Sequence, residues 1–293
     1  MELLNTLYNL MSLVFVLGTM ISMGLSLTVK QVTDPLRNTR FVIMALLANF
    51  ILIPAAAYVL TLVIPLNEAL VTGLILVSLA AGAPALPKLA QIAGVDTAAA
   101  TGLMVLLIVA TIIIMPIILP LLVSGVAVGF WDIASGLIVL MLIPLAVSLF
   151  VRARWESIAA SFHPYAAQAS TISLLFLLVL MLVLNWGNVV SLFGSRGLFA
   201  SLILVVIALV VGYFLGGSNK WVQSLGAGQR NIAAAMVVGT MNFSENPNVL
   251  VMIIVYSLIT MIIMTPLAGE LGKRAKAKAA EAVGETDAAI VSA

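Results

Sequence analysis

The chain has 293 residues, of which 63% are hydrophobic and 8% charged, and its mean hydropathy is +1.25. A soluble protein needs much more surface charge, so this composition excludes a soluble globular fold. The chain contains no cysteine, which excludes disulfides and thiolate metal sites, and its net charge is +2. The apolar runs are continuous and do not alternate. They predict an all-α polytopic membrane protein and not a β-barrel.

Hydropathy predicts about nine transmembrane helices along the chain. The expected ranges are 7–27, 41–64, 69–94, 97–123, 132–151, 169–184, 198–215, 222–241 and 249–267. The first run lacks the basic region and the small-residue cleavage site of a signal peptide, so we expect a true span.

Two of these spans are interrupted. The third contains "AAGAPALPKLAQ", with Pro84 and Pro87, and the eighth contains "LGAGQRN", with Gly226 and Gly228. Such residues release backbone hydrogen bonds that lipid cannot satisfy, so each break must face protein or a water-filled cavity. We therefore expect two discontinuous helices.

Basic residues predict the orientation in the membrane. Nearly all basic residues outside the spans lie in three predicted loops and a tail on one side of the membrane. They are Lys30, Arg37 and Arg40; Arg152 and Arg154; Lys220; and Lys273, Arg274, Lys276 and Lys278. The opposite loops hold Arg196. This asymmetry places the N-terminus outside and the C-terminus in the cytoplasm. We expect a multi-pass protein of a bacterial inner membrane, with a transmembrane domain over 1–270 and a disordered or frayed-helical cytoplasmic tail over 271–293.

An internal similarity suggests an inverted repeat. "MVLLIVATIIIMP" at 104–116 resembles "IVYSLITMIIMTP" at 254–266, and each follows an interrupted span. The copies lie an odd number of predicted spans apart, so they have opposite orientations. We predict a first repeat over about 1–125 and a second over about 130–270, with a transport site where the broken helices meet.

Two cations fall inside the predicted membrane spans. Lys88 lies in the third-span break and Arg230 in the eighth-span break, and no Asp or Glu lies at comparable depth. A cation at the centre of a span costs about 2.5–3.5 kcal/mol on insertion scales. Binding of an anion at the site would offset this cost. Gln229, Asn231 and Gln91 are candidates for oriented polar contacts to that anion.

Structural alternatives exist for each of these residues. Lys88 has a long stem that could reach the cytoplasmic face. Arg230 could cap the carbonyl groups that the break sets free. The amides of Gln229 and Asn231 could simply join helices by hydrogen bonds.

These stretches resemble the bile acid:sodium symporter family of secondary transporters over about residues 1–270. The likeness rests on the order and spacing of four segments: "MGLSLTVKQVTDPLRNTRFVIMALLANFILIPAAAYVL", "LVSLAAGAPALPKLAQIAGVD", "IIIMPIILP" and "GAGQRNIAAAM". The resemblance implies a panel domain, a core domain in which two broken helices cross, and organic anions as substrates. The family has ten spans, or nine when the first is absent.

The sequence departs from this family where the family binds sodium. The resemblance implies a glutamate at the second crossover and oxygen ligands on the span that follows the first. Here these positions correspond to Ser224, Met104 and Ile108. We infer that Lys88 and Arg230 replace the sodium ions, and we expect neither a cofactor nor a metal.

The sequence thus predicts a secondary transporter of a small or amphipathic organic anion that works by alternating access without sodium. Its expected partners are that anion and the lipid bilayer, with no nucleic acid. Alternatives are a sodium-coupled symporter of bile acid type, a uniporter, an exchanger or a proton-coupled carrier, a channel, and a membrane sensor without transport. An enzyme is disfavoured, because the spans hold no intramembrane acid pair, no cysteine and no metal-ligand cluster.

Overall fold

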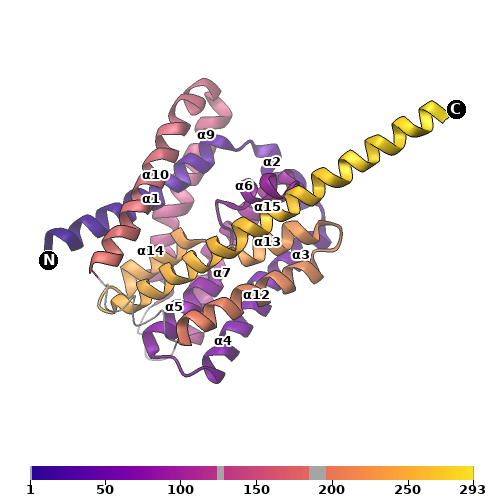
Figure 1. Ribbon diagram of the computed structural model, residues 1–293. Coiled ribbons are helices and arrows are strands. Elements are labelled where there is room, and N and C mark those ends of the chain that lie inside the picture. Colours follow the sequence, from indigo (N-terminus) through magenta and orange to yellow (C-terminus); the bar gives the residue numbers. More distant parts are fainter. Residues whose placement is uncertain (1, 124–128, 185–195, 293) are drawn as a thin grey trace.

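The computed structural model describes residues 2–123, 129–184 and 196–292. Throughout these ranges the chain forms helices and short connections without a strand (Figure 1), which confirms the all-α class. The helices of the first half are α1 (Glu2–Ser26), α2 (Val29–Thr33), α3 (Thr39–Leu47), α4 (Ile53–Val63), α5 (Glu68–Leu79), α6 (Leu86–Ala93) and α7 (Thr97–Leu122). Those of the second half are α8 (Phe130–Leu137), α9 (Ile143–Arg154), α10 (Glu156–Leu184), α12 (Arg196–Leu215), α13 (Lys220–Gly228), α14 (Ile232–Asn242) and α15 (Pro247–Ser292).

Two π-helical turns each join a pair of helices into one long rod. The turn η2 (Ala48–Leu52) connects α3 to α4, and η3 (Ile138–Leu142) connects α8 to α9. Each turn is followed by a proline, Pro54 or Pro144. Proline has no backbone N–H to donate to the preceding turn, which explains the local widening of the helix.

Six helical segments of the described chain are long and apolar enough to cross a membrane. They are Asn9–Ser26, Thr39–Val63, Thr97–Leu122, Phe130–Arg154, Arg196–Leu215 and Pro247–Ala277. Their outward side chains are apolar and open, as Leu121 and Phe214 illustrate at 78% exposure each. The chain is therefore a multi-pass membrane protein. The count of about nine spans stays a prediction, because the two interrupted spans consist of shorter helices and α10 is not among the six segments.

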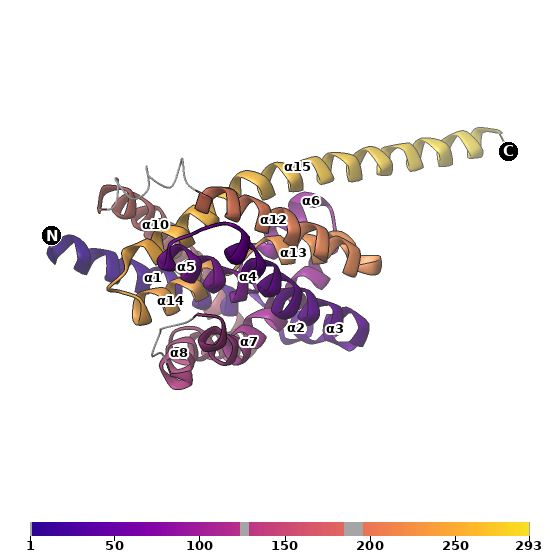
Figure 2. The ribbon, with the colours of Figure 1, turned by 90° about the horizontal axis from the view of Figure 1, so that it is seen from below.

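Two helices extend beyond the ranges expected for their spans. Helix α10 begins at Glu156, ahead of the span expected from residue 169, and His163 lies within this helix. Helix α15 runs through the expected tail to Ser292 and extends beyond the rest of the molecule (Figures 1 and 2), so the tail takes the helical one of the two states expected for it. Its composition accounts for this, since the segment is rich in alanine and Arg274 pairs with Glu270 at 2.9 Å across one helical turn.

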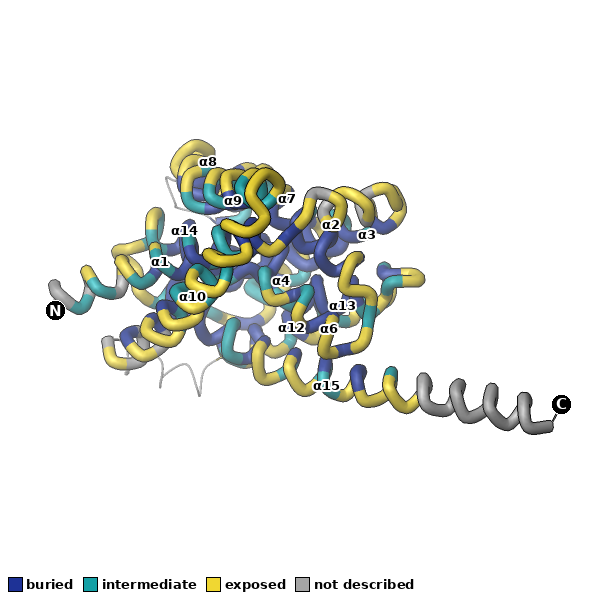
Figure 3. The backbone as a smooth tube through the Cα atoms, turned by 90° about the horizontal axis from the view of Figure 1, so that it is seen from above, coloured by how far each residue is buried: buried dark blue, intermediate teal, exposed yellow. Residues whose placement is uncertain are grey.

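Two groups of helices can be distinguished by their packing. The panel consists of α1, α9 and α10, which pack on one another at one side of the molecule. Gly18 of α1 allows this close packing, because a Cβ at this position would lie only 3.1 Å from the backbone nitrogen of Ser170 on α10. The core consists of α5, α6, α7, α13, α14 and α15, and its central segments are the most deeply buried (Figure 3).

Candidate functional site

The first break lies between α5 and α6, where the chain presses against α7. Gly82 has a φ of +83°, and a Cβ there would lie 2.5 Å from the backbone nitrogen of Ile108. The hydroxyl of Thr111 accepts a hydrogen bond from the Ala81 N–H and donates one to the Ala81 carbonyl, both at 3.0 Å. Thr111 therefore satisfies the backbone groups that the break removes from the helix.

The second break lies between α13 and α14 and touches the first. The backbone N–H of Asn231 donates to the carbonyl of Ala80 at 2.8 Å, which joins the two breaks directly. The side-chain oxygen of Asn231 accepts from the Ala234 N–H at 3.1 Å and so caps the start of α14. The two discontinuous helices thus meet at their interruptions.

Arg230 is the largest buried side chain at this crossing and is 1% exposed. Its Nε donates to the Val77 carbonyl at 3.2 Å, and its Nη2 donates to the carbonyls of Ser78 and Asn49. Its Nη1 donates to the Asn49 side-chain oxygen at 2.6 Å and to the Ala227 carbonyl at 3.3 Å. An arginine has five N–H donors, and each one here has a protein acceptor.

These acceptors explain why a cation is stable at this depth. The carbonyls of Val77 and Ser78 belong to the last turn of α5, and that of Ala227 belongs to the last turn of α13. The C-terminal end of a helix carries roughly half a negative charge. The guanidinium of Arg230 therefore offsets two negative helix ends that converge on it.

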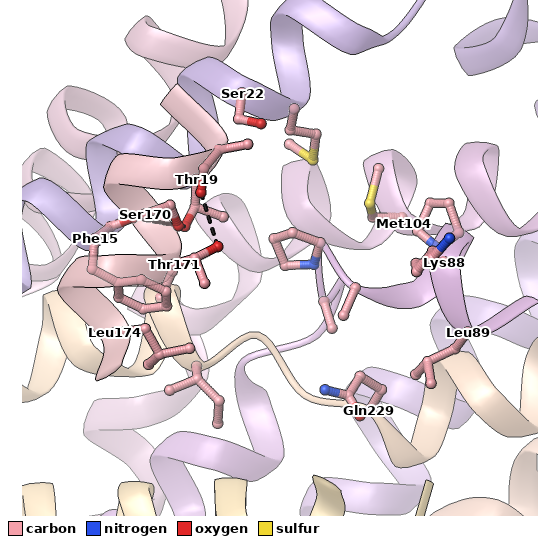
Figure 4. Close-up of a pocket in the computed structure, with 18 of the residues that line it drawn as sticks. Phe15, Thr19, Ser22, Lys88, Leu89, Met104, Ser170, Thr171, Leu174 and Gln229 are labelled. Atoms are coloured by element: carbon pink, nitrogen blue, oxygen red, sulfur yellow. Dashed lines mark hydrogen bonds between the residues drawn. The ribbon is translucent and has the colours of Figure 1, made fainter. Parts of the chain in front are cut away.

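The second halves of the broken helices, α6 and α14, begin at a cavity. It has a volume of about 600 Å³ and lies between α1 and α10 of the panel and the core helices. The first residues of α6 and α14 line it, so two N-terminal helix ends, which carry partial positive charge, border the same space. Lys88 lines the cavity from the first turn of α6 and is exposed to it (Figure 4).

A second cavity lies farther along the same interface. It has a volume of about 420 Å³ and is lined by Asn9 and Val16 of α1, and by Val237 and Thr240 of α14. Helices α1 and α14 border both cavities, whereas their lining residues differ. The panel and the core therefore enclose one space toward each end of α1.

Three of the five residues expected to contact the anion line the large cavity, and two do not. Lys88, Gln229 and Arg230 line it, and Arg230 does so with its donors already engaged. Gln91 lies outside the lining and accepts a hydrogen bond from the Lys88 ammonium at 2.9 Å. Asn231 is fully buried behind the lining, and its side-chain nitrogen has no partner.

Of the residues expected at the breaks, one lies in a break and the others lie in the adjoining helices. Pro84 lies in the first break, and Pro87 lies in the first turn of α6. Gly226 and Gly228 belong to the last turn of α13, so the second break consists of 229–231. Gly226 has a packing role, because a Cβ there would meet Leu103 at 2.7 Å.

The positions compared with the family's sodium site hold one side-chain oxygen, the hydroxyl of Ser224. The Ser224 hydroxyl donates to the Leu209 carbonyl of α12 at 2.8 Å. Met104 and Ile108 are buried, and both contact the position that a Gly82 Cβ would occupy. Apolar packing and Arg230 thus surround the crossing.

Sequence reasoning missed three contributors. Asn49 is a polar residue inside the predicted second span, but nothing in the sequence indicates that it lies in η2 next to Arg230. Thr111 and Gly82 gave no signal beyond their residue types, because their roles depend on contacts between different helices.

Helices that cross at paired breaks, with a cavity between two packed groups, are typical of a secondary transporter. A family model described as the sodium bile acid symporter family matches residues 13–192, which is more than half of the chain. The chain belongs to this family, and its class is that of membrane transporters of organic anions. A comparison with curated proteins found no match.

Proposed function

We propose that this protein is a secondary transporter that moves a small organic anion across a bacterial inner membrane by alternating access, without sodium. The observation that carries the proposal is the polarity of the crossing. In each broken helix, the first half (α5 or α13) directs its C-terminal end toward Arg230. The second half (α6 or α14) directs its N-terminal end toward the 600 Å³ cavity. An anion in that cavity would meet two positive helix ends and the ammonium of Lys88.

Lys88 is the residue best placed to contact the anion directly. It is exposed to the cavity, and its one described hydrogen-bond partner is the neutral amide of Gln91. None of the described residues that line the cavity is Asp or Glu, so no fixed negative charge there competes for the ammonium. Gln229 is half-buried in the lining and can add an amide hydrogen bond.

Arg230 contributes charge without contacting the substrate. Its five donors are used within the protein, so a bound anion would experience its field and not its hydrogen bonds. A hard cation such as sodium favours carbonyl and amide oxygens, and Arg230 is surrounded by oxygens of this kind. We therefore assign to Arg230 the task of a resident cation at the crossing, which removes the need for sodium there.

The two cavities support the alternating-access part of the proposal. The larger one is reached by Ser26 and Leu27, near the end of α1 that the basic loops place at the cytoplasm. The smaller one lies near the opposite end of α1. Movement of the panel against the core would open one while closing the other, and this conformation would face inward.

The test is the thermal stability of the purified protein with a panel of carboxylates, in sodium chloride and in choline chloride of equal ionic strength. A ligand that binds only the folded state raises its stability by mass action. We expect at least one carboxylate to stabilise the protein equally in both salts. Lys88→Gln should weaken that effect, whereas the control Lys30→Gln, which removes an exposed lysine outside this cavity, should leave it unchanged.

Two results would overturn the proposal. If the carboxylate stabilises the protein only in sodium, the chain is a sodium-coupled symporter. If no carboxylate has an effect that depends on Lys88, the cavity is not an anion site.

A further inference from the structure

The single histidine of the chain, His163, lines the large cavity from the panel. Ser170 and Thr171 follow it along α10 at the i, i+7, i+8 spacing of one helix face, and both also line the cavity. Figure 4 shows Thr171 on the opposite side of the space from Lys88. The panel therefore brings an imidazole to the cavity that the core enters with an ammonium group.

The imidazole of His163 is available to a ligand. The residue is partly exposed, and neither ring nitrogen has a hydrogen-bond partner within the described part of the chain. Histidine is the side chain that gains or loses its charge between about pH 5 and 8. His163 can therefore add a pH-dependent cation to the cavity beside Lys88 and Arg230.

The described lining offers no counter-ion to a charged His163. Its titratable side chains are all bases: Lys88 of α6, His163 of α10, and Arg230 between α13 and α14. Tyr165, two residues farther along α10, is 71% exposed and lies outside the lining. A charged ring would thus meet like charges across the cavity, unless an anion lies between them.

On the two long helices that border the cavity, the carboxylates just beyond the lining already have partners. Glu156 of α10 binds Arg152 at 2.8 Å, and Glu270 of α15 binds Arg274 at 2.9 Å. Of the helices packed against α10, α9 carries Arg152 and Arg154 in its last turn, and the lining residues of α1 are not titratable. An incoming anion is the counter-ion that a charged imidazole here lacks.

We propose that the protein binds its organic anion together with one proton, which His163 takes up from the solvent in the cavity. The anion lies between Lys88 on the core and the imidazolium on the panel. Each ligand favours the binding of the other, because their charges are opposite. The bound pair is electrically neutral, as a carboxylate with a sodium ion would be. This inference rests on the proposed anion site and adds the second ligand of that site.

The experiment measures the affinity for an anion against pH, in choline chloride of constant ionic strength. The probe is whichever of acetate, butanoate, hexanoate and benzoate stabilises the protein most, and all four are ionised above about pH 6. We expect binding to be about three- to tenfold tighter at about pH 6 than at about pH 8. Titration calorimetry in buffers of different ionisation enthalpy should show net proton uptake on binding.

Variants of α10 test whether His163 is the group that takes up the proton. His163→Gln stays polar without titrating, so its affinity should remain at the weaker value throughout. His163→Lys keeps a cation over this range and should bind at about pH 8 more tightly than the unchanged protein. The matched control combines His163→Gln with Gln168→His, because Gln168 is exposed on the same helix and outside the cavity lining. This control restores a histidine but should not restore the pH dependence.

The results separate this inference from the function on which it rests. If the probe binds in a Lys88-dependent way, but equally at both pH values and without proton uptake, the anion site stands and the proton inference is wrong. The same conclusion follows if the pH dependence survives in His163→Gln or returns in the control with Gln168→His. If no probe binds in a Lys88-dependent way, the proposed function itself is wrong.

Discussion

The guanidinium of Arg230 donates a 2.6 Å hydrogen bond to the side-chain oxygen of Asn49, and this contact ties the second broken helix to the π-helical turn η2. Arg230 also binds the Asn49 carbonyl, so both oxygens of one residue face the cation. No carboxylate among the described residues takes part. The positive charge is therefore balanced by oxygen dipoles and helix ends and not by a formal negative charge, so no described carboxylate at the crossing competes with an incoming anion.

Removing this side chain should convert the crossing into a sodium site. Arg230→Ala leaves the oxygens of Asn49, Val77, Ser78 and Ala227 around an empty space, at a cost of about 2 kcal/mol or more in folding stability. Sodium can bind such oxygens and would restore part of the loss. The measurement is the unfolding temperature in sodium chloride against choline chloride, and we expect a sodium-specific rise in this variant.

Two comparisons complete this prediction. Arg230→Lys keeps a cation in the same space, so it should be more stable than Arg230→Ala and indifferent to sodium. The unchanged protein should also be indifferent to sodium. A sodium-specific rise in the unchanged protein would mean that Arg230 has not replaced the ion.

Thr111 should be more important than its residue type suggests. Thr111→Val keeps the shape but removes both hydrogen bonds to Ala81, which leaves the buried Ala81 carbonyl unpaired and its N–H with only the Leu79 carbonyl, at a cost of about 1–3 kcal/mol. Thr101→Val is the control, because Thr101 is also buried on α7 but bonds only to the Thr97 carbonyl of its own helix. Equal losses of thermal stability in the two variants would contradict this role for Thr111.

The sequence located both interruptions to within a few residues, because proline and glycine act locally on the backbone, but Pro87, Gly226 and Gly228 lie in the adjoining helices. Both expected breaks fall within the predicted third and eighth spans, and helix α7 begins at Thr97 as expected. The tail was harder, since low hydrophobicity alone does not separate disorder from an alanine-rich helix. Its continuation to Ser292 follows from helix propensity next to an established helix.

The chemical partners at the crossing could not be predicted in the same way. Arg230 meets Val77, Ser78 and Asn49, which are remote in sequence, so its engagement depends on how whole helices cross. The sequence identified the cation and left open both an anion-binding and a carbonyl-capping role. The structure shows the capping contacts, while the attraction of an anion remains a proposal.

Gly82 should tolerate no side chain, in contrast to another glycine of similar conformation. Gly82 and Gly217 both have positive φ, at +83° and +54°. Nothing lies within 4 Å of a Cβ at Gly217, so Gly217→Ala should cost only the conformational term of about 1–2 kcal/mol. A Cβ at Gly82 would collide with the backbone of Ile108, so Gly82→Ala should yield little folded protein in detergent. Similar yields and melting temperatures for both variants would contradict the close approach of this break to α7.

Asn49→Asp tests whether the field of Arg230 acts on the substrate. The new carboxylate keeps an oxygen next to Nη1, so the guanidinium should remain in place, and it cancels the charge that the anion would experience. We expect a folded protein whose affinity for a stabilising carboxylate falls at least severalfold, as measured by the ligand-induced shift in unfolding temperature. Asn242→Asp is the matched control, because that amide donates to the Val238 carbonyl on α14 and does not line the large cavity. If both variants bind the carboxylate as well as the unchanged protein does, Arg230 holds the crossing together but adds nothing to anion binding, and Lys88 with the helix N-termini must account for the attraction alone.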